Sequence, residues 1–283
     1  MQVHTRERSS PDPIEVEEGQ DFIFTVRKLT RDVDNCLCVN YDGFTEDVEV
    51  GDQIFVDGGM VSFAVVDKAG PDVLCRCVDP GLILSRANLT FRRDDRLIRG
   101  RNSDLPVLTA KDWKDIDFAI SEGVEWIALS FVKSADVLKN LRSYIAARSD
   151  RDISLVAKIE SVDALPNLPE IIAASDAVMV ARGDLGAQVP IEDVPSVQKE
   201  IVMRCREAGK PVIVASQLLS SMIQFPTPTR AEVADIADVV RSRADALMVS
   251  GETAVGKHAD KAMDVLRTTA ADVEEWVRRE KYG

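Results

Sequence analysis

The chain has 283 residues, 45% of them hydrophobic, and a formal net charge of -13 at pH 7. This length accommodates one large domain, or one large and one small domain, with a substantial core. The negative charge repels a phosphate backbone or an anionic membrane on average, and the sequence has no apolar run of roughly 18 residues, so we expect neither nucleic acid nor membrane as a partner.

The five cysteines and two histidines restrict the chemistry further. An odd cysteine count in a chain of this length favours a reducing compartment. Four cysteines occur as C-x-C pairs, Cys36 with Cys38 and Cys75 with Cys77, inside strand-like runs. Structural zinc sites usually have longer C-x₂₋₄-C spacing, so these residues are interpreted as small core side chains. Two histidines leave no basis for a histidine triad or a histidine-rich metal site.

Residues 1–104 are predicted to form a small all-β domain. Its first 20 or so residues are polar and proline-containing and are expected to be flexible. Short runs rich in β-branched residues follow, separated by turn pairs such as Asp42-Gly43 and Gly70-Pro71. The predicted strands are Phe22 to Val26, Cys36 to Val39, Gln53 to Val56, Val61 to Val66 and Val73 to Val78.

Residues 105–283 alternate between strand and helix patterns, which predicts a parallel sheet covered by helices. The predicted strands are near-continuous apolar runs, as in buried parallel sheets. They are Trp126 to Val132, Leu155 to Ile159, Ala177 to Ala181, Pro211 to Ala215 and Ala246 to Val249. The predicted helices are Ala135 to Ala147, Val194 to Ala208, Arg230 to Arg243 and Lys261 to Arg279.

Each of these strands ends in a polar cluster, the position at which a β/α barrel or an open α/β sheet carries its active site. No Gly-x-Gly-x-x-Gly follows the first strand, which favours a barrel over a dinucleotide-binding fold. Five such units are fewer than the eight of a closed barrel. The clusters are Ser130-Phe131, Lys158-Ile159-Glu160, Arg182-Gly183-Asp184, Ser216-Gln217 and Ser250-Gly251-Glu252.

Two neighbouring clusters predict a site for a divalent cation. Side chains alternate faces along a strand, so Lys158 and Glu160 are expected to point to one side, and Arg182 and Asp184 likewise one strand over. Two carboxylates and a lysine would then converge, which is costly unless a ligand compensates the charges. We expect a metal between Glu160 and Asp184, with Lys158 facing an anionic substrate. An ion pair at the rim of a barrel is the structural alternative.

Six segments, in order along the chain, resemble the pyruvate kinase family. They are Ser130-Phe131-Val132, Ala157-Lys158-Ile159-Glu160, Met179 to Gly186, Lys210 to Ile213, Pro228 to Glu232 and Ser250 to Ala254. The resemblance extends from about Val26 to Lys257. The stretches Tyr41 to Phe44 and Ala215 to Leu219 look most like the plastid-type enzymes of plants and algae.

The resemblance implies a partial TIM-type β/α barrel with about five of eight βα units, preceded by a small all-β lid domain in residues 1–104. The first barrel strands and the C-terminal regulatory domain of the family have no counterpart here. We therefore expect a piece of a longer protein, a truncated gene model, or a paralogue completed by a partner. The resemblance also implies a homo- or hetero-oligomer in the plastid stroma, with the cytoplasm as the alternative.

Carried over onto this sequence, the family pattern makes Glu160 and Asp184 ligands of Mg²⁺ or Mn²⁺. Lys158 would stabilise the phosphoryl group in transit. Backbone N–H groups of Gly183 and Asp184, at the start of a short helix, would bind the substrate carboxylate. K⁺ is expected in the family, but the segments that supply its ligands are missing from this chain.

The same resemblance assigns the surrounding residues. Phe131 would form a wall of the substrate pocket and Ser130 would border the phosphate. Ser216 occupies the position of a family threonine near the proton path to the enolate and keeps its hydroxyl. Arg182 would either orient the carboxylates or contact substrate. Glu252 would either lie near the site or belong to a helix-cap network.

The implied function is phosphoryl transfer between phosphoenolpyruvate and ADP, giving pyruvate and ATP, with impaired activity in this chain. One alternative is a non-catalytic, regulatory or assembly subunit of a pyruvate kinase oligomer. A further alternative is a Mg²⁺-dependent aldolase acting on pyruvate-like enolates.

Overall fold

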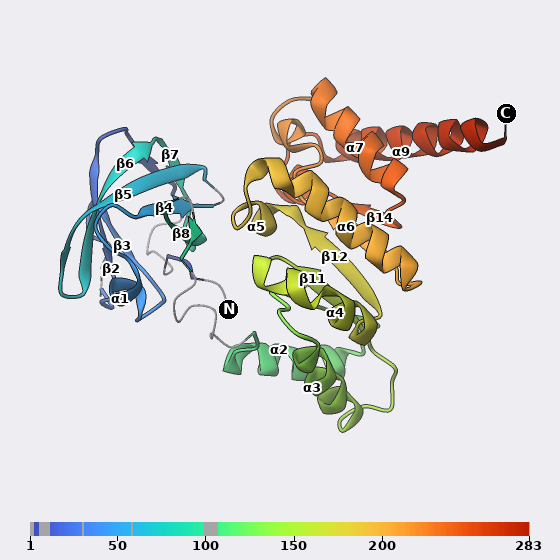
Figure 1. Cartoon of the computed structure of the whole chain (residues 1–283), viewed down its shortest axis with the longest axis horizontal. Helices are drawn as coiled ribbons and strands as arrows, with labels where there is room; N and C mark the ends of the chain where they lie inside the picture. Colours follow the sequence, from blue (N-terminus) through green and yellow to red (C-terminus); the bar gives the residue numbers. More distant parts are fainter. Residues whose placement is uncertain are drawn as a thin grey trace. The chain divides into compact units, whose positions relative to one another are not determined.

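The computed structural model describes residues 3–5, 12–29, 31–57, 59–94, 96–98 and 107–282. The chain divides into two compact units, one of Met1–Thr109 with Gly186–Pro190 and one of Ala110–Leu185 with Ile191–Gly283. Figure 1 labels the helices and strands of both units. Within the described ranges, no helix combines the length and apolar character needed to cross a membrane.

The first unit is built on a seven-stranded sheet with the order β3-β2-β6-β5-β4-β8-β9. The β2 and β3 pair is parallel, and the other neighbouring pairs are antiparallel. A second sheet of two strands pairs β1 (Ile14–Val16) with β7 (Gly81–Ile83). The seven strands are β2 (Asp21–Thr25), β3 (Cys36–Cys38), β4 (Gln53–Val56), β5 (Val61–Ala69), β6 (Asp72–Asp79), β8 (Leu89–Arg93) and β9 (Arg96–Leu97).

These strands confirm the five predicted in this part of the sequence, and a short helix, α1 (Phe44–Asp47), is added to them. The strands surround a core of aromatic rings, since alternate residues of β2 point inward. The rings of Phe24 and Phe63 contact edge to face with centroids 5.1 Å apart, and Phe44 and Phe91 lie 5.2 Å apart. Such contacts stabilise the core beyond simple burial.

The beginning of the chain differs from the predicted flexible stretch. Val3 and Val16 are 1% and 2% exposed, so both add apolar area to the core. Ile14–Val16 pairs with β7, and His4 forms an isolated bridge with Asn88. Burial of these valines outweighs the polar character of the surrounding sequence. The predicted flexibility of residues 6–11 lies outside the described residues.

The second unit is built on a curved five-stranded parallel sheet in sequential order: β10 (Trp126–Leu129), β11 (Ser154–Ile159), β12 (Ala177–Ala181), β13 (Val212–Ala215) and β14 (Ala246–Met248). The sheet confirms the five predicted strands and fits an α/β barrel. Central strand β12 is buried throughout, as its apolar run predicts. The edge strands are less buried than predicted: Trp126 and Met248 are 53% and 38% exposed, because each edge strand has a neighbour on one side only.

Helices follow the strands of this unit. Helix α3 contacts β11, α6 contacts β12 and β13, and α7 packs along α9 (Figure 1). The α-helices are α2 (Ala110–Glu122), α3 (Ala135–Ala146), α4 (Leu168–Ala174), α5 (Arg182–Gly186), α6 (Val194–Glu207), α7 (Arg230–Ser242), α8 (Gly251–Ala254) and α9 (Ala259–Tyr282). Three short 3₁₀ helices, η2 (Val162–Asn167), η3 (Ile191–Asp193) and η4 (Ser220–Ile223), lie between them.

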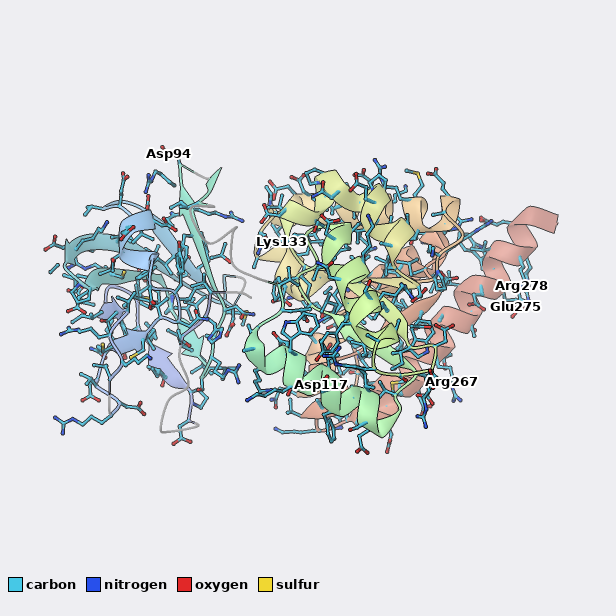
Figure 2. The ribbon with its side chains drawn as sticks, turned by 90° about the horizontal axis from the view of Figure 1, so that it is seen from below. Asp94, Asp117, Lys133, Arg267, Glu275 and Arg278 are labelled. Atoms are coloured by element: carbon cyan, nitrogen blue, oxygen red, sulfur yellow. The ribbon has the colours of Figure 1, made fainter. Side chains whose placement is uncertain are left out.

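Helix α9 has one packed side and one charged side. The guanidinium of Arg241, from the last turn of α7, lies 4.5 Å from the centre of the Trp276 ring, which joins the two helices. Arg267, Glu275 and Arg278 extend from the helix surface (Figure 2). Arg267 pairs with Asp264 one turn earlier at 3.1 Å, an arrangement that supports an exposed helix by a few tenths of a kcal/mol.

Two aspartates hold the amino-terminal ends of the strands. Asp176 precedes β12, and its Oδ2 accepts a hydrogen bond from the Leu155 N–H at 2.7 Å. Asp245 precedes β14, and its Oδ2 accepts from the Val212 N–H at 2.8 Å. The two aspartates begin similar runs, Asp176-Ala177-Val178-Met179-Val180 and Asp245-Ala246-Leu247-Met248-Val249, so the same contact occurs twice. Each aspartate satisfies a strand-end N–H and fixes the stagger between neighbouring strands.

Candidate active site

The end of β11 places a lysine beside a buried carboxylate. Lys158 and Glu160 lie two positions apart and point to one side, as predicted, with Nζ of Lys158 2.7 Å from Oε1 of Glu160. The parallel register pairs Leu129 with Ala157, so Ser130 follows at the same level of the neighbouring strand. Lys158 Nζ donates a hydrogen bond to Ser130 Oγ at 3.0 Å. Lys158 therefore contacts two other predicted site residues, Glu160 and Ser130.

Glu160 is 1% exposed, so its charge depends on protein partners. Oε1 contacts Lys158, and Oε2 accepts a hydrogen bond from the Phe131 N–H at 2.7 Å. Phe131 has a φ of +51°, an uncommon conformation for a residue with a side chain. The hydrogen bond from its N–H to Glu160 supports this conformation, and such strain is typical of functional sites.

Arg182 and Asp184 do not share a face as predicted. β12 ends at Ala181 and helix α5 begins at Arg182, so the alternation of a strand does not continue through these residues. Residues two apart in a helix point about 200° apart around its axis. Arg182 is 7% exposed, whereas Asp184 is half-buried in the first turn of α5.

The guanidinium of Arg182 is surrounded by protein acceptors. Nε and Nη2 donate to the Ser216 carbonyl at 3.1 and 2.8 Å, and Nη2 also donates to the Gln217 carbonyl at 3.0 Å. Nη1 donates to Gln198 Oε1 at 3.2 Å. Both Nη atoms bind the Asp235 carboxylate, at 2.7 and 2.8 Å. All three nitrogens are thus engaged within the protein, and the carboxylate that they bind is that of Asp235. Whether Arg182 orients the two predicted metal ligands or contacts substrate stays a prediction.

Ser216 lies beside Gly183. The register pairs Ala181 with Ala215, so Arg182 and Ser216 follow neighbouring strand ends. A methyl group built on Gly183 would lie 3.6 Å from Ser216 Cβ and 3.7 Å from its Oγ. The sequence predicted both residues as site residues, and the fold brings them together.

Glu252 forms a backbone network. It is 1% exposed, and its two oxygens accept hydrogen bonds from the Leu219 N–H at 3.0 Å and the Ser250 N–H at 2.8 Å. Ser250 is the N-cap residue of α8, and Leu219 lies in the loop after β13. Glu252 therefore joins two loops at the ends of neighbouring strands, in agreement with the cap-network alternative.

The start of α7 is joined to the same loop. Thr229 and Glu232 form a reciprocal capping box, and Glu232 also accepts hydrogen bonds from the backbone and hydroxyl of Ser221 at 2.8 and 2.6 Å. Burial opposes ionisation of Glu232, but these hydrogen bonds from Ser221 and Thr229 outweigh it and lower the pKa of the carboxyl below its usual value. The charged form of Glu232 thus stabilises the loop after β13.

Sequence reasoning missed Asp235 and Gln198. Both lie in helices, α7 and α6, and reach Arg182 across the fold. Neither residue stands in a polar cluster at a strand end. A buried partner for Arg182 could be expected on electrostatic grounds, because a guanidinium of low exposure needs a carboxylate. Nothing in the spacing along the sequence identifies which carboxylate it is.

The donor chemistry at Glu160 suits a magnesium ion. Mg²⁺ is typically bound by one or two carboxylates, waters and substrate phosphates rather than by an all-protein cage. Across the described residues, no group of three or more histidine, cysteine or acidic side chains could hold a metal ion. A magnesium site completed by waters and substrate phosphates would use the two predicted ligands, Glu160 and Asp184.

Comparisons with known proteins identify the chain's relatives. It is 58% identical over 283 residues to pyruvate kinase isozyme A, chloroplastic, of Ricinus communis, covering 99% of this chain and 48% of the relative. It is 51% identical over 264 residues to plastidial pyruvate kinase 3, chloroplastic, of Arabidopsis thaliana, covering 93% and 45%. The crystal structure of a pyruvate kinase from Cryptosporidium parvum superposes with a TM-score of 0.78 at 30% identity, covering 97% of this chain and 56% of that one.

The chain spans about half the length of these curated relatives. Its match to the family model for the pyruvate kinase barrel domain extends over residues 1–263. The identities, the superposition and the polar clusters at the strand ends agree with one another. The chain belongs to the pyruvate kinase family.

Proposed function

We propose that this chain carries the phosphoryl-transfer centre of a pyruvate kinase, acting between phosphoenolpyruvate and ADP to give pyruvate and ATP. The observation that carries the proposal is the contact of Lys158 with Glu160 and Ser130 at the end of β11. A partly exposed ammonium group beside a buried carboxylate is suited to an anionic substrate that binds with a metal ion. Family membership supplies the reaction class.

Phosphoryl transfer requires alignment and charge neutralisation more than a protein nucleophile. Lys158 is partly exposed, and its ammonium can therefore reach a phosphoryl oxygen. An ammonium about 4 Å from such an oxygen contributes on the order of 4 kcal/mol at an effective dielectric constant of 20. Contributed only in the transition state, this energy corresponds to roughly a thousandfold in rate. Ser130, which accepts a hydrogen bond from Lys158, would border the same phosphate.

Glu160 and Asp184 would hold Mg²⁺ or Mn²⁺. The bound ion would supply positive charge that neutralises the phosphate and the developing enolate. The protein's own contribution is to hold the Glu160 carboxylate in place, through Lys158 and the Phe131 N–H. K⁺ is a general requirement of the family, and none of the residues described above is assigned to it.

The substrate carboxylate would bind near Gly183 and Asp184, and the phenyl ring of Phe131 would form a wall of the pocket. After the phosphorus–oxygen bond to the enolate oxygen breaks, the methylene carbon must gain a proton. Ser216, whose side chain is the nearest neighbour of a methyl group placed on Gly183, is suited to orient the donor of that proton. The two steps together convert phosphoenolpyruvate, ADP and a proton into pyruvate and ATP.

Relatives named as chloroplastic, such as those of Ricinus communis and Arabidopsis thaliana, support a plastid location for this protein. We extend that location to this chain as part of the same proposal. Immunolocalisation of the endogenous protein would test it. Signal confined to the cytoplasm would contradict a plastid location without affecting the proposed chemistry.

The decisive experiment measures binding and turnover separately in the purified full chain. Thermal unfolding is followed with phosphoenolpyruvate, with and without Mg²⁺, and pyruvate formation is followed by a coupled assay with ADP. We expect Mg²⁺-dependent stabilisation by phosphoenolpyruvate, lost in Lys158→Ala and Glu160→Gln. Lys139→Ala, which removes a 66% exposed lysine from α3, is the matched control and should behave as the unmodified chain.

Stabilisation that persists in Lys158→Ala would refute the assigned site. Binding without pyruvate formation would favour a non-catalytic subunit. Turnover of pyruvate with an aldehyde in the absence of nucleotide would favour an aldolase. Turnover with ADP that is abolished in both site variants but retained in Lys139→Ala would support the proposal.

A further inference from the structure

Two consecutive residues after β13 have a left-handed backbone. Ser216 and Gln217 have φ angles of +75° and +55°, and neither is glycine. A single residue of this kind is uncommon, and two in succession persist only where the surrounding structure holds them. The backbone at Ser216 determines where its hydroxyl lies relative to Gly183.

The side chain of Arg182 supplies that support. Its guanidinium binds the Ser216 carbonyl through two nitrogens and the Gln217 carbonyl through one. Arg182 is itself at the start of α5, next to Gly183 in the sequence. A rigid guanidinium thus connects the two strand ends on which Gly183 and Ser216 lie.

Asp235 in turn fixes Arg182. The pair is bidentate, with Oδ1 2.7 Å from Nη1 and Oδ2 2.8 Å from Nη2. The two carboxylate oxygens match the planar fork of the guanidinium, which determines orientation as well as charge. Among the residues that the structure describes, Gln198 is the side-chain acceptor that remains for Arg182 if the carboxylate is removed. The guanidinium would then be held by neutral acceptors alone, which fix its orientation less strictly than the bidentate carboxylate does.

We propose that Asp235 is a positioning residue, which acts through Arg182 to hold the left-handed Ser216–Gln217 segment and thereby the Ser216 hydroxyl at the proton-transfer position. The effect on catalysis rests on the proposed function, whereas the effect of Asp235 on the Ser216–Gln217 backbone does not. It assigns to α7 a role in the reaction that the strand-end clusters do not indicate. The two hydrogen bonds between Asp235 and Arg182 involve neither Lys158 nor Glu160. A change at Asp235 should therefore alter proton transfer without altering the binding of metal and phosphate.

The test compares Asp235→Asn with Asp238→Asn. The asparagine at position 235 keeps the size of the side chain and one carbonyl acceptor but removes the second acceptor and the charge. Asp238 lies on the same helix and is exposed, so its replacement controls for a changed charge on α7. Amide hydrogen exchange is measured by mass spectrometry over peptides covering residues 212–222, together with kcat and KM for phosphoenolpyruvate.

We expect faster exchange confined to the segment around Ser216 in Asp235→Asn, and unchanged exchange in Asp238→Asn. We expect kcat to fall by between about tenfold and a hundredfold, the loss typical of a reacting group displaced by about 1 Å. KM should change by less than about twofold, because the groups that bind the phosphate and metal are intact. Exchange of the methyl protons of pyruvate, a measure of the enolate step alone, should fall with kcat.

Unaltered exchange in the 212–222 peptides of Asp235→Asn would overturn the proposal, as would full turnover in that variant. Equal acceleration across the whole second unit would also overturn it, because that result indicates general destabilisation. If Asp235→Asn does not fold, Asp235→Glu, which keeps the charge but displaces the carboxylate, should show the same kcat loss at constant KM. Absence of turnover in the unmodified chain would refute the proposed function, and hydrogen exchange would then decide the structural part by itself.

Discussion

Replacing Lys158 by methionine tests the electrostatics of the site without requiring catalysis. The methionine keeps much of the length of the side chain and removes its charge. Glu160, which is 1% exposed, would lose its partner at 2.7 Å and keep only the Phe131 N–H. An ionised carboxylate in that environment is poorly compensated.

The magnitude follows from the burial of the two partners. Removing one member of a buried ion pair typically costs 3–5 kcal/mol. The Lys158 side chain is 24% exposed, which places the expected loss at the lower end, about 3 kcal/mol. For a unit of this size the melting temperature should fall by roughly 6–12 °C. The double variant Lys158→Met with Glu160→Gln removes both charges and keeps an acceptor for Phe131, so it should lose only about 1 kcal/mol.

Urea unfolding, followed by tryptophan fluorescence, measures the stability of the unmodified chain and of the two variants at neutral pH. Magnesium should restore part of the stability of Lys158→Met, since it can compensate the isolated carboxylate, and should leave the double variant unchanged. A loss below about 1 kcal/mol in Lys158→Met would refute the reasoning, because a buried carboxylate would then tolerate removal of its cation. Equal losses in the single and double variants would refute it as well.

Three further outcomes are expected. Gly183→Ala should fold normally, because the added methyl group would lie 3.6 Å from Ser216 Cβ, an ordinary contact. Mg²⁺-dependent stabilisation of this variant by phosphoenolpyruvate should nevertheless disappear. If the stabilisation is retained, the substrate binds elsewhere. Glu252→Gln should lose about 1–3 kcal/mol in urea unfolding, since an amide nitrogen would face a backbone N–H donor, and an unchanged midpoint would contradict this network. Burial opposes ionisation of Asp176, but hydrogen bonds from the Leu155 N–H and Arg142 outweigh it and lower the pKa below the ordinary 3.8. The stabilisation from the ionised Asp176 is therefore complete above that unfolded-state value and is lost as the pH falls through the lower folded-state pKa. The stability difference between the unmodified chain and Asp176→Asn should shrink over that range.

Strand positions were predictable because burial imposes a direct pattern on the sequence. The apolar run Ala177 to Ala181 is recovered residue for residue as β12, and Gln53 to Val56 as β4. The run Trp126 to Val132 was predicted too long. The strand ends at Leu129, and the chain turns at Phe131, whose positive φ is maintained by a hydrogen bond to Glu160. That contact joins residues far apart in the sequence and cannot be read from local preference.

The site was predictable where it depends on side chains alternating between the two faces of a strand. It was not predictable where it depends on the residue at which a helix begins. Lys158 and Glu160 meet because β11 continues to the lysine. Arg182 and Asp184 do not share a face, since helix α5 begins directly after β12. The partner of Arg182 is Asp235, a choice made by the packing of α7. Packing of this kind follows from the whole fold rather than from a motif.

The aspartates at positions 176 and 245 have a consequence for how this scaffold can vary. Both fasten the amino-terminal margin of the sheet, opposite the ends that carry Lys158 and Ser216. Contacts that stabilise the sheet thus lie at one end of the strands and reactive side chains at the other, the separation seen in β/α barrels generally. Loops on the reactive rim are consequently free to acquire new lengths and new specificities without unfastening the strands beneath them.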